Sequence, residues 1–204
     1  MAKVIFHIFF TLLICLLPSV SAAEKEKRNI LYLNTYHNGY RWSDKHLDGI
    51  RSVLNKRPYK NDMQIEYMDA KKYNYRTTKQ RLYSLYKEKF QDEHFDVIII
   101  SFYDALNFIQ EYSGLLFPDS PVVFCGINGI ETVADNHSNL TGIFEDFDLV
   151  KTLEIVRTLH PEKKRMIVFG DNSTAGRAIA DQITEKLEQA NFNLEVEFWA
   201  GLSL

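Results

Sequence analysis

Residues 96–101 read DVIIIS, a run of four apolar residues between an aspartate and a serine. The strands of a parallel sheet are covered by helices on both faces, so their sequences are continuously apolar and do not alternate with polar residues. The stretch PVVFCG at residues 121–126 has the same character. Together the two stretches predict a parallel α/β sheet whose central strands are buried.

Strand-like and helix-like stretches alternate on either side of this pair. Further strands are predicted at residues 29–36, 63–70, 140–147, 166–171 and 194–199. The stretches between them have helical spacing. Leu47, Ile50 and Leu54 fall on one helical face, and they follow Ser43, a residue type that favours the N-cap. Repeated strand–helix units of this length predict a three-layer sandwich, with a parallel sheet between helices and right-handed crossovers.

The chain divides into three predicted parts. Residues 1–23 are a signal peptide, residues 24–146 form an N-terminal α/β lobe, and residues 147–204 form a crossover and a partial second α/β lobe. The last part supplies only two strands and two helices. These strands either extend the first sheet or begin a second lobe. We favour a shortened second lobe, because WAGLSL at residues 199–204 has no helix after it to cover the last strand.

The N-terminus has the pattern of a secretory signal peptide. Lys3 precedes the apolar run VIFHIFFTLLICLL at residues 4–17, and the small residues that follow suit cleavage after Ala22 or Ala23. The run is shorter than the roughly 20 residues of a membrane span. The alternative is an uncleaved N-terminal anchor. A cleaved signal predicts a periplasmic or extracellular protein.

Charge and cysteine count exclude several classes. The formal charge is −3, and it becomes −4 without Lys3, because residues 1–22 contain no acid. Nucleic acid is therefore not an expected partner. Cys125 is the one cysteine left after cleavage, so no intramolecular disulfide is expected. No Cys/His set has zinc-ligand spacing, and we expect neither a metal nor a cofactor.

Polar and aromatic residues follow every predicted strand. In an open parallel sheet, ligands bind outside the carboxyl ends of the strands, so these residues are expected to converge on one rim. A mixed apolar and polar rim of this kind is typical of a small-molecule site. The residues after successive strands are Tyr36, His37, Asn38, Tyr40 and Trp42; Asp69; Ser101, Tyr103, Asp104 and Asn107; Cys125, Gly126 and Asn128; Glu145 and Asp146; and Asp171, Asn172 and Ser173.

Each of these residue types also has an ordinary structural use. One or two of the aromatic residues after the first strand can simply cover the first helix. A lone His37 is commonly a structural hydrogen-bonding residue, and Ser101 can be the N-cap of the helix after it. Acids near strand ends often cap helices, and Asp148 has that pattern.

The sequence lacks the common enzyme motifs. It contains no GxSxG elbow, no GxxxxGK[ST] phosphate loop and no GxGxxG fingerprint. GDNSTAGR at residues 170–177 has the glycines and hydroxyls to cradle an anion before a helix, but no lysine of a nucleotide site. No catalytic residue can be assigned. A secreted α/β enzyme stays as an alternative, because catalytic triads are assembled in space.

Several stretches resemble one known family. ILYLNTYHNGYRWSD (30–44), IEYMDAKK (65–72), FDVIIISFYDALNFI (95–109), FPDSPVVFCGIN (117–128) and TGIFEDFDLVKTLEIVRTLHPEKKRMIVFGDNSTAGR (141–177) look like the periplasmic substrate-binding proteins of ABC transporters. The match is to the branch also found as extracytoplasmic sensor regions of histidine kinases and diguanylate cyclases. The tyrosine-rich first motif resembles the sensor branch most.

The resemblance implies a type I periplasmic-binding-protein-like fold, in which two α/β lobes joined by a hinge clamp a small organic ligand. Phe102 and Tyr103 depart from the family, which more often has a polar pair there. The implied ligand contacts are Tyr36, His37, Tyr40, Trp42, Ser101, Tyr103, Asp104, Asn107, Gly126, Asn128, Glu145, Asp146, Asn172 and Thr174.

The expected function is therefore solute binding without chemistry, with a membrane permease as partner. The alternative within binding is a sensor domain, or a fragment of one, with a signalling partner. A non-functional shortened product is a third possibility. Its unfinished sheet would leave an open strand edge, which also makes a homodimer possible.

Overall fold

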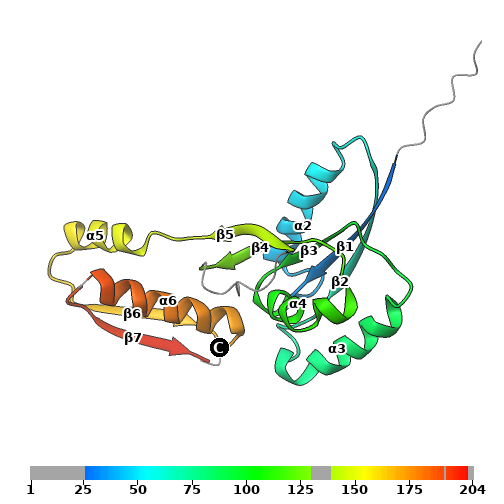
Figure 1. Ribbon diagram of the computed structural model, residues 1–204. Helices are drawn as coiled ribbons and strands as arrows, with labels where there is room; N and C mark the ends of the chain where they lie inside the picture. Colours follow the sequence, from blue (N-terminus) through cyan, green and yellow to red (C-terminus); the bar gives the residue numbers. More distant parts are fainter. Residues whose placement is uncertain (1–25, 130–138, 191, 202–204) are drawn as a thin grey trace, which may run out of the picture.

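The structure is a computed structural model that describes residues 26–129, 139–190 and 192–201. It contains two separate parallel sheets (Figure 1). The larger sheet has five strands in the order β2-β1-β3-β4-β5, and the smaller sheet pairs β6 with β7. The strands are β1 (Lys27–Asn34), β2 (Lys60–Tyr67), β3 (Val97–Ser101), β4 (Val122–Asn128), β5 (Leu140–Glu145), β6 (Arg165–Gly170) and β7 (Glu195–Ala200). The helices are α2 (Arg41–Leu54), α3 (Tyr75–Lys89), α4 (Tyr103–Leu116), α5 (Leu149–Leu159) and α6 (Thr174–Ala190).

The predicted parallel α/β fold is confirmed. We call β1–β5 with α2, α3 and α4 the five-stranded unit, and α5, β6, α6 and β7 the two-stranded unit. Because β6 and β7 pair only with each other among the described residues, they do not extend the first sheet. The signal-peptide prediction concerns residues 1–23, which lie outside the described residues. Within the described ranges, no helix has both the length and the apolar character needed to span a bilayer.

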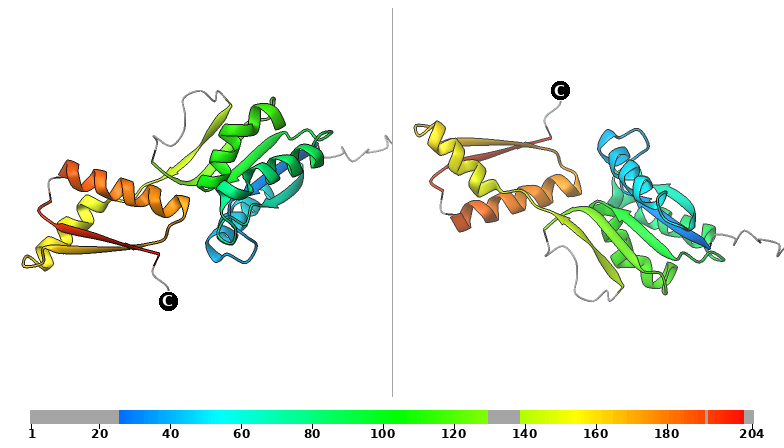
Figure 2. Two further views of the ribbon diagram at one scale, coloured as in Figure 1. Left: turned by 90° about the horizontal axis from the view of Figure 1, so that it is seen from below. Right: turned by 90° about the horizontal axis from the view of Figure 1, so that it is seen from above.

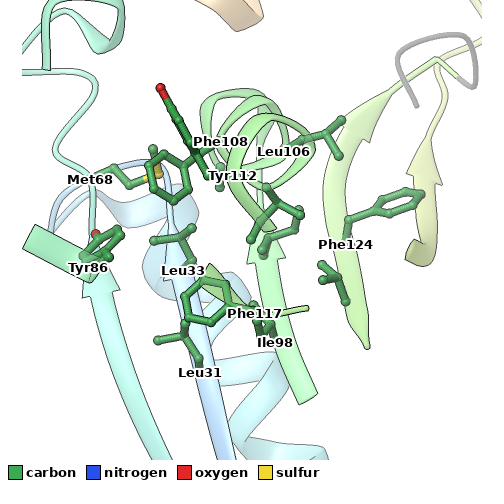
Figure 3. Packing of buried hydrophobic residues seen from close by; sticks show 14 of the residues in the cluster. Leu31, Leu33, Met68, Tyr86, Ile98, Leu106, Phe108, Tyr112, Phe117 and Phe124 are labelled. Carbon is green, nitrogen blue, oxygen red and sulfur yellow. The ribbon is translucent and has the colours of Figure 1, made fainter. Parts of the chain in front are cut away.

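The core of the five-stranded unit lies between the sheet and the α3–α4 pair. Successive strand residues point to opposite faces. Leu31 and Leu33 of β1 and Ile98 and Ile100 of β3 belong to one buried cluster with side chains of α3 and α4 (Figure 3). The helix α2 covers the opposite face of the sheet (Figure 2). This double cover explains why β3 reads as a continuous apolar run.

The helix ends differ in part from the predictions. Ser43 is not the N-cap of α2, because the helix begins at Arg41 after Tyr40. The Ser43 side chain is buried and donates a hydrogen bond of 3.1 Å to the Tyr40 carbonyl. Asp148 does cap α5, where its carboxylate accepts a hydrogen bond from the Lys151 amide. Gly39, at φ +89°, lies in the loop between β1 and α2, two residues before the helix begins, and glycine adopts such a φ without strain.

The two-stranded unit is joined to the five-stranded unit through the extended segment between β5 and α5 (Figure 1). Its helix α6 begins at Thr174, and the Ser173 hydroxyl accepts a hydrogen bond of 3.1 Å from the Gly176 amide, as an N-cap does. The N-terminus of α6 lies beside the N-terminus of α4, so loops of both units meet there.

Candidate functional site

A cavity of about 480 Å³ lies between the two units, at the carboxyl ends of the strands. Its volume is in the range of small-molecule sites. The five-stranded unit and the connection after it contribute Tyr36, Tyr40, Trp42, Lys71, Phe102, Tyr103, Gly126, Asn128 and Glu145. The two-stranded unit contributes Val168, Phe169, Gly170, Asp171, Asn172, Ser173, Ala175, Gly176, Arg177, Ile179, Ala180, Phe198, Trp199 and Ala200.

Aromatic rings line the cavity from both units. On one side, the Tyr36 ring lies 4.7 Å from the Tyr40 ring and 4.6 Å from the Phe102 ring, measured between centroids. On the other side, the rings of Phe169 and Trp199 meet edge to face at 5.4 Å. Aromatic pairs of this spacing are attractive and rigid. The arrangement lines the cavity with aromatic rings from both units.

One ion pair connects the units beside this cavity. Lys71 Nζ lies 2.5 Å from Asp171 Oδ2 and 3.4 Å from the Ser173 hydroxyl oxygen. Burial by itself would raise the pKa of Asp171, but hydrogen bonds from Lys71 and Ser173 outweigh it and lower that pKa to about 2. The Lys71 ammonium also lies 5.6 Å from the centroid of the Tyr36 ring, within the range of a cation–π contact. Lys71 therefore links both units to the aromatic wall.

Two further charges border the cavity. Among the described residues Arg177 makes no ion pair, and its guanidinium donates to the Asn172 carbonyl. Glu145 has one ionisable partner in this part of the chain, His46, whose Nε2 lies 3.8 Å from Oε1. Burial lowers the pKa of His46 below its ordinary value of 6.5, so the imidazole is neutral at pH 7 and leaves the Glu145 charge uncompensated. A guanidinium and a carboxylate are thus both accessible to a ligand.

A second, smaller cavity of about 340 Å³ lies on the other side of the Lys71–Asp171 pair. Asp104 and Thr174 border it, and the Thr174 hydroxyl donates a hydrogen bond of 2.7 Å to Asp104 Oδ1. Burial raises the pKa of Asp104, although the bond from Thr174 and the charge of Arg177 oppose that shift. This bond is a second polar contact between the units.

Cys125 and His46 lie next to each other beside the aromatic wall. The Cys125 Sγ atom is 3.7 Å from His46 Nδ1. Burial, together with the negative charge of Glu145, raises the pKa of Cys125 to about 11. Because the thiol and the imidazole are both neutral at pH 7, the pair lacks the thiolate that a nucleophilic cysteine requires.

The structure brings eight of the fourteen predicted contact residues to the main cavity. They are Tyr36, Tyr40, Trp42, Tyr103, Gly126, Asn128, Glu145 and Asn172. The other six, His37, Ser101, Asp104, Asn107, Asp146 and Thr174, do not line it. Their roles in ligand binding remain predictions, and for five of them the structure records another contact.

Ser101 lies furthest from the expected arrangement. Its side chain is fully buried, and its hydroxyl lies 2.8 Å from that of Tyr32 within the core. Asp146 instead accepts a hydrogen bond of 2.7 Å from Lys186, while Asp104 and Thr174 bond to each other. The His37 ring packs 5.7 Å from Tyr40, measured between centroids. Each strand end does approach the rim, but the individual side chains turn to either side of it.

Several cavity residues were missed by the sequence analysis. Lys71 follows β2 within the stretch IEYMDAKK, and Arg177 ends the stretch GDNSTAGR, so both lay inside motifs already singled out. Phe102 was named only as a departure from the family, and Phe169, Phe198 and Trp199 were given no role. Their sequence context is apolar, and only the approach of the second sheet makes them part of a cavity.

Metal binding finds no support in the described part of the chain. No three His, Cys, Asp or Glu side chains gather there in a group that could hold a metal ion. The site's chemistry is that of aromatic surfaces, a few hydrogen-bonding groups and separated charges.

No protein-family model and no curated protein sequence matches the chain. Solved structures do match. A conserved domain protein from Vibrio cholerae has a TM-score of 0.64 at 14% identity, with 86% of this chain and 58% of that chain covered. An ABC domain in complex with L-Trp from Streptococcus pneumoniae has a TM-score of 0.59 at 19% identity, with 84% and 56% covered. A solute-binding protein of an ABC transporter from R. palustris, in complex with 4-hydroxybenzoate, has a TM-score of 0.54 at 14% identity, with 86% and 47% covered.

These matches establish the class of fold. The chain has the α/β fold of the type I periplasmic binding proteins, as its sequence resemblance predicts. It spans between 47% and 58% of the length of these three solved chains. The five-stranded unit corresponds to one lobe of that fold. At these sequence identities the similarity establishes the fold alone, and it does not identify a ligand or a partner of this chain.

Proposed function

We propose that this protein is an exported receptor that binds a small organic ligand between its two units without transforming it. The observation that carries this proposal is the cavity of about 480 Å³, to which both units contribute aromatic rings and charged groups. A site shared by two units is the usual place for a ligand that brings them together. The fold is one used by solute-binding proteins.

The lining favours a ligand that contains a ring. Trp42 is 57% exposed and Phe169 is 69% exposed, so large apolar faces are open to solvent beside the cavity. Burying such a face against a planar ligand is favourable, by about 25 cal/mol for each Å² removed from water. Two proteins of the same fold are described in complex with ring compounds, L-Trp and 4-hydroxybenzoate. A cyclic ligand with a polar or charged end therefore fits this site best.

Ligand binding would act by closing the two units on each other. The extended segment between β5 and α5 connects them and provides the hinge. A ligand shifts the open–closed equilibrium only by its differential affinity for the two states. Aromatic residues from both sides supply that difference, because Tyr36 and Trp199 can contact one ligand together only when the units are close.

We propose that a membrane permease recognises the closed form of the protein and that the protein takes part in transport. The alternative is a sensor domain, favoured by the tyrosine-rich stretch at residues 30–44, with a histidine kinase or diguanylate cyclase as the signalling partner. Permease and ATPase genes beside this one would support transport, whereas a kinase or cyclase gene there would support sensing. N-terminal mass spectrometry of the exported protein tests the location, with Ala23 or Glu24 expected as the first residue.

A catalytic role is the weaker reading. The cysteine nearest the cavity is held as a thiol with a pKa of about 11, and its imidazole neighbour His46 is neutral at pH 7. If the protein is nevertheless an enzyme, incubation with a bound compound will yield a product. We expect the compound to be recovered unchanged.

The two tryptophans provide the test of the proposal. Trp42 and Trp199 are the only tryptophans in the sequence, and they line the cavity from opposite units. We expect a bound ring compound to change the emission of both, so that Trp42→Phe and Trp199→Phe each remove part of the signal. Isothermal titration calorimetry against amino acids, nucleosides, aromatic acids and sugars measures affinity independently. Absence of heat and of any emission change across this panel would overturn the proposal.

A further inference from the structure

Phe102 has an unusual backbone conformation at the base of the cavity. It follows β3 directly, precedes α4, and has φ +70° and ψ 173°. This region is essentially confined to glycine, and residues held there cluster at functional sites. The Phe102 side chain is only 4% exposed, yet it lines the cavity. A large ring therefore occupies a position at which the backbone conformation favours glycine.

The neighbours of Phe102 are arranged around its ring. The ring lies 4.6 Å from the Tyr36 ring at an interplanar angle of 32°, and 4.8 Å from the His46 ring. A Cβ atom on Gly126 would lie 2.7 Å from Phe102 Cε1, so glycine at 126 is what leaves room for the ring. Gly126 has a φ of +70° as well. The residue that follows β3 and one residue of the adjacent strand β4 thus both have a positive φ around this one side chain.

The hydroxyls of the residues that flank Phe102 in the sequence, Ser101 and Tyr103, are already paired within the protein. The Ser101 hydroxyl is bonded to that of Tyr32, and the Thr35 hydroxyl donates to the Ser101 carbonyl at 2.8 Å. The Tyr103 hydroxyl donates to the Asn128 carbonyl at 2.8 Å and accepts from the Asn128 amide at 3.1 Å. The base of the cavity is consequently closed by the little-exposed residues Phe102 and Tyr36, and the residues that flank Phe102 in the sequence offer a ligand no free hydroxyl.

The charged groups lie nearer to solvent. Arg177 is exposed, and the side chains of Glu145 and Lys71 are 38% and 22% exposed. Phe102 and Tyr36, by comparison, are only 4% and 7% exposed. The cavity is therefore apolar at its base and charged at its solvent-facing edge.

We propose that Phe102 is a specificity-determining residue, whose ring, seated against Gly126 and Tyr36, selects a ligand with a planar ring at its inner end and its polar groups at the solvent-facing edge. This inference rests on the proposed receptor function and narrows it. A polyol would leave its inner hydroxyl groups against this apolar floor without hydrogen-bonding partners, and the charged ammonium and carboxylate of a small acyclic amino acid would lie close to it. The apolar ring of a cyclic ligand can meet the floor without leaving a polar group unpaired.

The test compares affinity across two kinds of probe. Indole, L-tryptophan and 4-hydroxybenzoate are the ring probes, and D-glucose and L-glutamate are the probes without an aromatic ring. Calorimetric titrations use the full chain as wild type, as Phe102→Leu and as Phe95→Leu. Phe102→Leu keeps an apolar side chain and the backbone conformation but removes the flat face. Phe95→Leu makes the same change in the core, just before the amino end of β3.

We expect wild type to bind at least one ring probe and Phe102→Leu to bind it about tenfold more weakly, the upper range of an aromatic pair. Phe95→Leu should lower the melting temperature and leave affinity unchanged. If wild type binds ring probes and Phe102→Leu binds them equally well, this inference falls and the receptor function stands. This inference also falls, and the receptor function stands, if wild type binds D-glucose or L-glutamate more tightly than the ring probes. If wild type binds none of the five probes, the inference and the ring class fall together, and the wider panel decides the receptor function separately.

A second measurement needs no ligand. At an ordinary position alanine is more stable than glycine, but at the φ and ψ of Phe102 the order should reverse. We expect Phe102→Gly to melt about 2–4 °C above Phe102→Ala, as a modest stability difference gives in a chain of this size. An equal or lower melting temperature for the glycine variant would show that the backbone is not held in this conformation, and would overturn the proposed placement of the ring.

Discussion

Lys71 and Asp171, which are 100 positions apart in the sequence, form an ion pair between the two units of the protein, with 2.5 Å between Nζ and Oδ2. The contact is partly shielded, since the Lys71 side chain is 22% exposed and that of Asp171 is 54% exposed. It lies beside the main cavity and separates it from the smaller one. A ligand that enters the cavity therefore meets a pair of charges that already holds the units together.

Replacing Lys71 by methionine should loosen the contact between the units. The ion pair is partly exposed, so we expect a change of at most about 1 kcal/mol in stability. The larger effect should be an increase in radius of gyration, measured by small-angle X-ray scattering. Lys151→Met is the matched control, because the Lys151–Asp148 pair of 2.8 Å lies within one helix. An unchanged radius for Lys71→Met would show that the pair does not restrain the units.

The same contact should weaken in acid. The pKa of Asp171 is lowered to about 2 from an ordinary 3.8. A group with a lowered folded-state pKa stabilises the fold above its ordinary pKa, and that contribution is lost as pH falls. The radius of gyration should therefore rise between about pH 4 and pH 2. In Lys71→Met this increase in radius of gyration at low pH should be smaller. An increase of equal size would show that other carboxylates cause it.

Thr174 and Asp104 provide the opposite pH dependence. Burial raises the pKa of Asp104, so its contribution to stability is largest below the ordinary pKa and declines as pH rises through the folded-state value. Thr174→Val removes the hydrogen bond of 2.7 Å to the buried carboxylate. We expect a loss of about 1–3 kcal/mol at pH 7 in urea denaturation, and a smaller loss at pH 4.

Thr184→Val is the control for this change. Thr184 lies on the same helix, is exposed, and donates only to the Ala180 carbonyl. Its replacement should change stability by less than about 0.5 kcal/mol at either pH. Equal losses for the two variants would mean that the Thr174–Asp104 bond contributes no more than a local helix contact.

The fold could be predicted from the sequence because β3 and β4 are mostly apolar, as strands that are buried on both faces are. Ile98 and Ile100 face one side of the sheet and Ile99, between them, faces the other, and both sides are covered. Only a strand between two layers of helices needs this composition. The same logic gave the convergence of strand ends, which brought Tyr36, Gly126 and Glu145 to one cavity.

The side chains that define the site were harder to predict for two physical reasons. Ser101 is the last residue of β3, and the direction of its side chain toward Tyr32 depends on strand register. Phe102 takes a backbone conformation that nothing in a phenylalanine signals, because glycine is the residue that marks such positions. The Lys71–Asp171 pair requires the placement of one unit against the other, which local patterns do not contain.

The thiol of Cys125 should be slow to react. Its pKa is raised to about 11 by burial, whereas an unfolded cysteine titrates near 8.5. At pH 8 the folded protein should be alkylated by iodoacetamide about 100-fold more slowly than the protein in guanidinium chloride. Mass spectrometry of the peptide that contains Cys125 measures this rate without interference from Cys15. Rapid alkylation of the folded protein would indicate an activated thiolate and would support the alternative that the protein is an enzyme.

Gly126→Ala should destabilise the protein and distort the base of the cavity. The positive φ of Gly126 is costly for any other residue, and the added Cβ would lie 2.7 Å from the Phe102 ring. Strain of this kind costs about 1–3 kcal/mol before any displacement of the ring is counted. Urea denaturation measures the loss. Gly49→Ala is the control, because Gly49 lies within α2 with nothing within 4 Å of its added Cβ, and it should gain about 0.4–1 kcal/mol.

The double variant Gly126→Ala with Phe102→Gly separates the two causes. If the clash with the ring matters, the alanine at 126 should cost less in the Phe102→Gly background than in wild type, leaving only the cost of its positive φ. If the cost is the same in both backgrounds, the two residues do not touch in solution. The packing of the Phe102 ring over Gly126 would then be wrong, and with it the apolar floor on which ring selectivity depends.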